Sequence, residues 1–218
     1  MTPLDLVLQF TILLFALYNS SNKSIQDCVI INGGGYSGFW YYYGYLQNNK
    51  KNTIDKTVYC YSSGCLAYVA LLTHNNSTYL YEQTNALAID YNNNKLTNYD
   101  VKEQFINIIA RNVSNLQNYN LNILTTNYAG QCIIKQPKTT SQLISALDET
   151  TNIPVLTTKL DFNKNLDGGL CYAIYFNKYC SSSIMLPYKY RFYSNIFNKN
   201  LSPDDVSYFM DYTFYFII

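Results

Sequence analysis

Hydrophobic and polar positions along the chain predict a succession of short strands and helices. Residues 29–31 are β-branched and apolar, and residues 57–61 form a second strand-like run. Residues 66–72 are rich in helix formers, and residues 101–113 carry apolar side chains at helical spacing, so both segments are predicted to be helical. Residues 120–126 alternate between polar and apolar side chains, which predicts another strand.

The remaining elements follow from similar patterns in the second half of the chain. Residues 131–134 are predicted to form a strand beside 120–126, and residues 171–175 also have the composition of a strand. The strongly aromatic segment 206–218 is expected to pack as a terminal element. The aromatic run at 40–43 is expected to lie in the core, since no basic groove beside it indicates a surface that stacks nucleic-acid bases.

The N-terminal segment is set apart from the rest of the chain. Residues 6–17 are apolar apart from Gln9 and Thr11, and a polar stretch follows them. This run fits a signal-peptide core better than the roughly 20 residues needed to span a bilayer. Asp5 stands where a signal peptide would carry positive charge, so a membrane anchor remains an alternative. We assign residues 1–27 to this segment and its linker, and residues 28–218 to one folded domain.

Composition limits the partners and the compartment. The 218 residues include 15 basic and 14 acidic side chains. This balance leaves no excess of positive charge to attract nucleic acid. Six cysteines permit disulfides, with 15 possible pairings, in an oxidising compartment. A secretory or membrane-associated location is therefore expected. With one histidine and no Cys-x-x-Cys spacing, no metal site is predicted.

A glycine cluster follows the first predicted strand. Gly33, Gly34 and Gly35 can turn backbone N–H groups into an anion-binding nest at a helix N-terminus. The anion could be a phosphate or the oxyanion of an acyl-transfer intermediate. Gly33, Gly35 and Gly38 also match a dinucleotide-binding fingerprint, but no carboxylate ends the next strand to hold a ribose. A P-loop is excluded, because no Gly-Lys-Ser/Thr closes the cluster.

A candidate nucleophile lies at the end of the second predicted strand. Ser62 occupies a strand-to-helix turn with small neighbours, Ser63 and Gly64, and such a turn exposes the hydroxyl above a helix N-terminus. The alternative is an ordinary helix N-cap. His74 would lie roughly 18 Å further along the same helix, too far to act as its base. We therefore expect His74 to be a solvated residue at the helix end, and a Ser–His–Asp triad is excluded.

A third motif completes a recognisable order. Asp167-Gly168-Gly169 follows a glycine-rich loop, 33–38, and a serine elbow, 60–64. In this order the motifs resemble those of the patatin-like phospholipase family, whose members use a Ser–Asp dyad without histidine. Residues 143–147 and 150–154 are similar to the helix and loop that precede the family's aspartate.

The resemblance implies a fold, a chemistry and a set of site residues. The fold would be a three-layer α/β/α domain with a mainly parallel central sheet. The activity would be lipid acyl hydrolysis of the phospholipase A or lysophospholipase type, without metal or cofactor, on a phospholipid or other acyl-ester lipid at a membrane surface. The implied site residues are the nucleophile Ser62, the general base Asp167, the oxyanion-hole glycines Gly33, Gly34 and Gly35, and Gly64, which supports the elbow.

Two positions depart from the family pattern. Cys60 replaces the first glycine of the elbow, where its sulfur is expected to displace the strand and misplace Ser62. Ser37 stands where the family carries Arg or Lys, so the oxyanion loop lacks a positive charge. The alternative function is therefore a catalytically impaired relative that acts as a lipid-binding or structural membrane-associated protein.

Overall fold

The computed structural model describes residues 26–154, 156–158, 161–176 and 179–212. The predicted signal or anchor segment and the end of the C-terminal aromatic segment lie outside these residues. The first strand begins at Gln26, so Gln26 and Asp27 belong to the sheet and not to a linker. No helix in the described ranges is long and apolar enough to cross a membrane.

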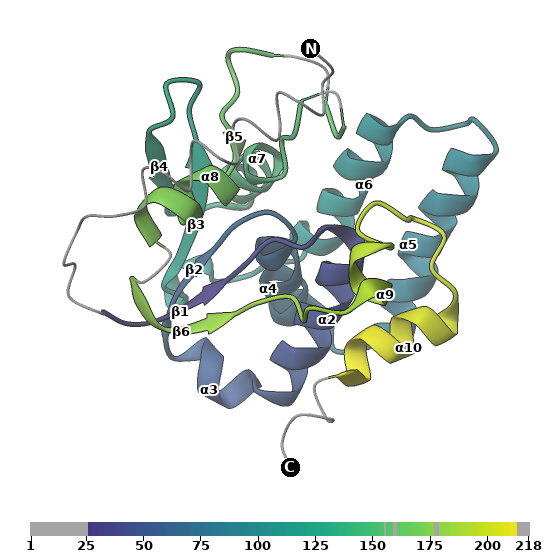
Figure 1. Ribbon diagram of the computed structural model, residues 1–218, viewed down its shortest axis with the longest axis horizontal. Helices are drawn as coiled ribbons and strands as arrows, with labels where there is room; N and C mark the ends of the chain where they lie inside the picture. The colour runs from purple at the N-terminus through teal and green to yellow at the C-terminus, as the bar shows by residue number, and fades with distance from the viewer. Residues whose placement is uncertain (1–25, 155, 159–160, 177–178, 213–218) are drawn as a thin grey trace.

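A single mixed sheet forms the centre of the molecule (Figure 1). Its strands are β1 (Gln26–Ile31), β2 (Thr57–Cys60), β3 (Leu121–Thr126), β4 (Cys132–Lys135), β5 (Leu166–Asp167) and β6 (Cys180–Ile184). The spatial order is β4-β3-β2-β1-β6, and β5 pairs separately with β3. β6, β1, β2 and β3 run parallel, whereas β4 and β5 are antiparallel to β3. The sheet is therefore mainly parallel, as predicted.

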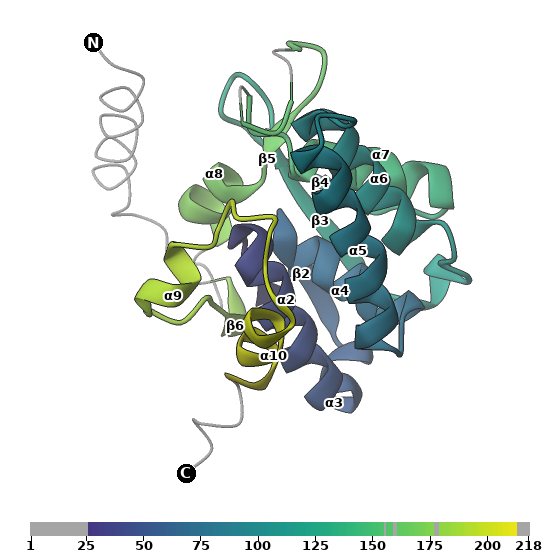
Figure 2. The same ribbon diagram turned by 90° about the vertical axis from the view of Figure 1, so that its right-hand side faces the viewer.

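Helices lie on both faces of the sheet, which makes the fold a three-layer α/β/α arrangement (Figure 2). They are α2 (Gly35–Asn48), α3 (Lys50–Ile54), α4 (Ser63–Thr73), α5 (Ser77–Asn92), α6 (Asn98–Ala110), η1 (Leu116–Asn118), α7 (Thr140–Thr150), α8 (Gly169–Cys171), the π-helix η2 (Tyr172–Phe176), α9 (Tyr190–Tyr193) and α10 (Pro203–Asp211). α2 and α4 pack together under one face, and α8 with η2 covers part of the other.

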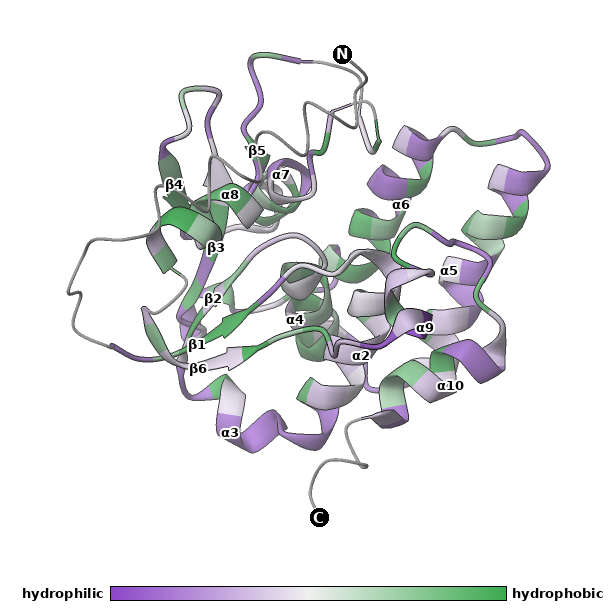
Figure 3. Ribbon diagram, in the orientation of Figure 1, coloured by the Kyte–Doolittle hydropathy of each residue, from purple (hydrophilic) through white to green (hydrophobic). Residues whose placement is uncertain are grey.

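The alternation of side chains along the strands builds two unequal cores. Val29 and Ile31 of β1 face the larger core with α2 and α4, while Ile30 faces the smaller one with α8 and η2. Figure 3 accordingly colours β1 and α4 largely green. The aromatic run of α2 lies in the larger core, where Trp40 and Tyr43 are fully buried. The prediction that this run packs in the core is confirmed.

The strand predicted at residues 171–175 is wrong, because this segment forms the end of α8 and the π-helix η2. The Cys171 N–H donates to the Thr126 hydroxyl at 3.1 Å, and the Tyr172 ring stacks on Tyr61 with centroids 5.3 Å apart. These contacts lay the segment across the sheet face. Cys171 and Phe176 are therefore buried without a strand partner, whereas Ile174 and Tyr175 are 39% and 40% exposed.

Candidate active site

The turn between β2 and α4 holds Ser62 in an unusual backbone conformation. Its φ of 52° and ψ of −135° lie in a region that non-glycine residues rarely adopt and that costs about 1–3 kcal/mol. The turn can form because Gly64 packs directly on the end of β1. A Cβ atom on Gly64 would lie 2.3 Å from the Asn32 carbonyl oxygen. Gly64 thus supports the elbow, and Ser62 stands at the N-terminus of α4.

Thr150, at the end of α7, fastens this turn to the sheet. The Ser62 N–H donates to the Thr150 hydroxyl at 3.0 Å, and that hydroxyl donates to the Leu124 carbonyl at 2.7 Å. Thr150 is fully buried. Sequence reasoning did not single out this residue, since nothing local to residue 150 indicates a partner 88 positions away.

Asp167 reaches the same region through β5. β2 pairs with β3 up to Ile123, and the chain then leaves the sheet at the Ser62 turn. Beyond this point β5 pairs with β3, and Asp167 lies opposite Thr125. The Gly169 N–H donates to Asp167 Oδ1 at 2.8 Å, which orients the carboxylate. Asp167 Oδ2 is buried and accepts no hydrogen bond from any described residue.

Burial raises the pKa of the Asp167 carboxyl to about 6, against the opposing effects of the Ser62 hydroxyl and the Gly169 N–H. The Ser62 hydroxyl is therefore close enough to favour the ionised carboxylate. It does not form an aligned hydrogen bond, because Oδ2 has no partner among the described residues. Apo active sites commonly show such loose contacts. A carboxylate with this pKa is ionised at neutral pH and is more basic than an ordinary aspartate.

The glycine loop lies next to the elbow, but its amides are not equivalent. The Gly34 N–H donates to the Ser63 hydroxyl at 2.9 Å and is thus already engaged. Gly35 begins α2 with a φ of 62°, and no described residue accepts a hydrogen bond from its N–H. The Ser63 N–H likewise has no acceptor in the described ranges, whereas the Gly33 N–H interacts with the Tyr61 hydroxyl and lowers its pKa. The Gly35 and Ser63 amides near Ser62 are therefore without an acceptor among the described residues.

Ser37 brings no charge to the glycine loop and is held by the core. It is fully buried, and its hydroxyl donates to the Phe192 carbonyl at 2.8 Å. This contact ties the start of α2 to α9. Ser37 therefore has a structural role in positioning the loop.

One disulfide lies at the Ser62 turn, and another lies close to the Asp167 turn. Cys60, at the end of β2, is bonded to Cys65 in the first turn of α4, so the bond spans the elbow. Cys132 of β4 is bonded to Cys171, directly after the Asp-Gly-Gly turn. The Cys60 sulfur is therefore bonded across the turn that it was expected to disturb, and the expectation that it displaces the strand stays a prediction. The third disulfide, Cys28–Cys180, joins β1 to β6.

His74 ends α4 as expected, but the expectation that it is solvated is wrong. Its exposed fraction is 9%, its ring Nε2 lies 3.1 Å from the Ile108 carbonyl oxygen, and its own carbonyl accepts from the Tyr43 hydroxyl. The neighbouring α6 covers this helix end. His74 is thus a hydrogen-bonded core residue at the opposite end of α4 from Ser62.

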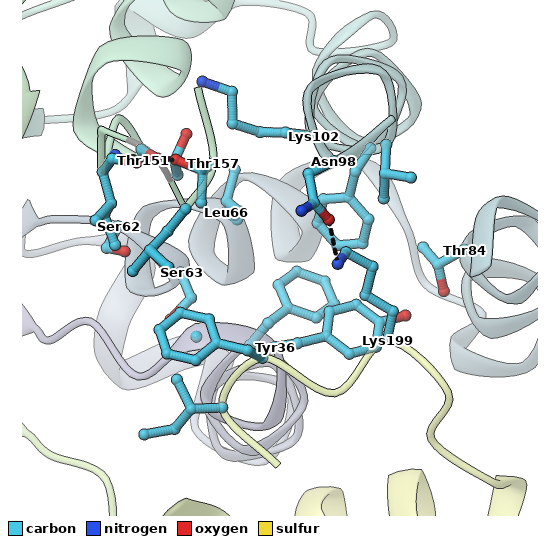
Figure 4. A pocket seen from close by; sticks show the side chains of 18 of the residues that line it. Tyr36, Ser62, Ser63, Leu66, Thr84, Asn98, Lys102, Thr151, Thr157 and Lys199 are labelled. Carbon is cyan, nitrogen blue, oxygen red and sulfur yellow. Dashed lines mark hydrogen bonds between the residues drawn. The ribbon is translucent and has the colours of Figure 1, made fainter. Parts of the chain in front are cut away.

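A pocket of about 320 Å³ opens beside Ser62 (Figure 4). Most of its wall is apolar, and its side chains come from α2, α4, α5, α6, the segment that follows α7 and the segment between α9 and α10. The apolar lining includes Tyr36, Phe39, Leu66, Leu87, Val101, Phe105, Ile153, Leu156, Ile196 and Phe197. Its two charged residues are Lys102 and Lys199. The volume lies at the lower end of the range for small-molecule sites.

Comparison with known proteins identifies no relative of this chain. No family model matches the chain, and a search of the curated proteins finds no match.

Within the described ranges, no group of three or more acidic, histidine or cysteine side chains could hold a metal ion.

Proposed function

We propose that the protein is a serine-dependent lipid acyl hydrolase of the patatin-like type, in which Ser62 and Asp167 form the catalytic dyad. One observation carries the proposal: Ser62 has a rare backbone conformation, near a buried carboxylate with a raised pKa, at the wall of an apolar pocket. Strained backbone and perturbed pKa values gather at functional sites. The apolar wall favours an acyl chain over a polar substrate.

The mechanism is a two-step acyl transfer. Asp167 Oδ2 accepts the proton of the Ser62 hydroxyl while the serine oxygen attacks the ester carbonyl. The N–H groups of Gly35 and Ser63 stabilise the oxyanion that forms. As the ester bond breaks, the proton passes from Asp167 to the departing alcohol, leaving an acyl-serine. Asp167 then takes a proton from water as the water oxygen attacks the acyl carbonyl. It returns that proton to the Ser62 oxygen as the acyl–serine bond breaks and the fatty acid leaves.

Covalent labelling tests the nucleophile directly. We expect purified protein to react with a fluorophosphonate probe, and the Ser62→Ala variant to lose both labelling and ester hydrolysis. Ser63→Ala is the matched control, because it removes a neighbouring hydroxyl and should keep at least about a tenth of the wild-type rate. Labelling that survives Ser62→Ala but not Ser63→Ala would overturn the assignment.

One observation favours a catalytically impaired relative that binds lipid. The Gly34 N–H is engaged by the Ser63 hydroxyl, which leaves fewer amides for the oxyanion. Under this alternative the pocket would hold an acyl chain without cleaving it. It predicts that a fatty acid binds while the wild-type protein reacts with no fluorophosphonate.

Two further features support a secretory or membrane-surface setting. All six cysteines are paired, as is usual in oxidising compartments and rare in the cytosol. Leu156 and Phe197 line the pocket and are 51% and 60% exposed, so part of its apolar lining reaches the protein surface. An exposed apolar rim is suited to taking a lipid from a membrane surface.

A further inference from the structure

The two lysines of the pocket differ in their electrostatic partners. Lys102 Nζ lies 2.6 Å from Asp148 Oδ1, so a carboxylate offsets its charge. Lys199 Nζ donates to Asn98 Oδ1 at 2.6 Å and lies 4.2 Å from the centre of the Tyr91 ring. Neither of these partners carries a charge. No carboxylate of the described residues forms an ion pair with Lys199.

The surroundings of Lys199 leave its ammonium group able to bind an anion. An ammonium has three N–H donors, and Asn98 accepts one of them. Lys199 is half-buried, and burial lowers its pKa because water is partly excluded without a compensating negative charge. No aspartate or glutamate lines the pocket. An anionic ligand would therefore supply the missing charge.

Lys199 is separated from the nucleophile within the same pocket. Figure 4 shows Ser62 and Ser63 on one side and the hydrogen-bonded pair of Lys199 and Asn98 on the other. Apolar side chains, among them Leu66 and Phe105, belong to the wall of this pocket. A ligand that contacts both sides needs an apolar body and one anionic group.

We propose that the pocket selects single-chain acyl esters that carry an anionic group, and that Lys199 is the residue that recognises this group. The inference rests on the proposed function only in so far as the ligand is an ester. A cavity of about 320 Å³ can enclose one short acyl chain, and the second chain of a diacyl lipid would have to lie outside it. The anionic group can be a phosphate or a carboxylate, since both accept hydrogen bonds from an ammonium.

Binding to the Ser62→Ala protein tests this inference without hydrolysis. The probes are decyl phosphate, decanoate and the neutral decyl glyceryl ether, each below its micelle concentration. We expect at least one of the two anions to bind about tenfold or more tightly than the ether, and Lys199→Met to abolish that advantage. Comparison of the two anions identifies the preferred one. Raising the salt concentration should weaken only the anions.

Control variants distinguish a specific loss of anion binding from a general loss of structure. Lys95→Met removes a surface lysine that pairs with Asp90 outside the pocket, and it should leave all three affinities unchanged. Lys199→Gln keeps a polar side chain and should also lose the preference for anions. Equal affinity of the ether and both anions for the Ser62→Ala protein, or an anion preference that survives both Lys199 variants, would overturn the inference.

Hydrolysis assays test the anion site and the proposed function independently of each other. With an active enzyme, Lys199→Met should raise KM for an anionic decanoyl ester and leave kcat unchanged. Monodecanoylglycerol, which is neutral, should show neither change. If anions bind through Lys199 but no ester is cleaved and Ser62 is not labelled, the proposed function fails and the anion site stands. If esters are cleaved without any effect of Lys199, only the anion site fails.

Discussion

The Ser62 N–H donates a hydrogen bond to the hydroxyl of Thr150, which lies 88 positions further along the chain. The same hydroxyl donates to the Leu124 carbonyl of β3, so one buried side chain links the serine turn to the central sheet. β3 also pairs with β5, which carries Asp167. Both members of the proposed dyad are thus linked to β3. A substitution at Thr150 should therefore change the position of Ser62.

Thr150→Val should impair the site while preserving its shape. Valine is similar in size, but it leaves the Ser62 N–H and the Leu124 carbonyl without their partner. We expect a loss of about 1–3 kcal/mol in the free energy of unfolding and a clear fall in the fluorophosphonate labelling rate. Thr150→Ser keeps the hydroxyl and is the matched control. Equal labelling rates for the Val and Ser variants would show that this hydrogen bond does not position Ser62.

The rate of acylation should depend on the ionisation of Asp167. Because its pKa is raised to about 6, the carboxylate is mostly protonated at pH 5 and mostly ionised at pH 7. The labelling rate should therefore rise with pH and level off above about pH 7. Stopped-flow or timed labelling across this range measures the profile. A rate that is constant from pH 5 to pH 8 would contradict a role for Asp167 as the base.

Asp167→Asn should abolish fluorophosphonate labelling and stabilise the fold at high pH. The carboxyl pKa rises from 3.8 in the unfolded chain to about 6 in the folded one, so the folded state binds more protons between these values. The stability contributed by this group is therefore present at low pH and is lost as pH rises through 6. At pH 8 the buried charge costs about 3 kcal/mol.

Asparagine removes that charge and keeps an oxygen to accept from the Gly169 N–H. Urea unfolding with intact disulfides should show Asp167→Asn to be more stable than wild type by about 1–3 kcal/mol at pH 8. The difference should fall to about half near pH 5 and shrink toward zero only below the unfolded pKa of 3.8. A variant that is less stable at both pH values would mean that the carboxylate is better solvated than its burial implies.

Removal of the Cys28–Cys180 disulfide should mainly lower stability, whereas removal of the Cys60–Cys65 disulfide should mainly lower activity. In the chain-entropy description, loss of Cys28–Cys180, which spans 152 residues, costs about 5 kcal/mol, whereas loss of Cys60–Cys65, with a separation of 5, costs about 2 kcal/mol. The Cys60→Ala/Cys65→Ala protein should nevertheless lose more labelling activity, because its bond spans the Ser62 turn.

The Cys28→Ala/Cys180→Ala protein is the control for this comparison. It should unfold at lower denaturant concentration, and its folded fraction should label at nearly the wild-type rate. Treatment with a dithiol should reproduce the loss of labelling. If the two double variants lose labelling only in proportion to their unfolded fractions, the elbow disulfide has no special role in positioning Ser62.

The sequence alone determined the local elements and the motifs at their ends. The prediction of a strand at residues 120–126 agrees with β3, and that of a helix at 101–113 agrees with α6 apart from its ends. Such elements follow from side-chain periodicity over a few residues, which does not depend on distant partners. Ser62 and Gly64 were recognisable for the same reason, since a tight turn constrains its own residues.

Only the tertiary structure decided which of these elements meet. Sequence patterns favoured a strand at 171–175 and a solvated His74, but long-range packing places 172–176 in a π-helix and buries His74. The observed set of three disulfides is one of 15 possible sets, and its Cys60–Cys65 bond depends on how β2 turns into α4. Likewise, the role of Thr150 arises only when α7 packs on β3. These features depend on contacts between residues far apart in the chain, which local periodicity does not encode.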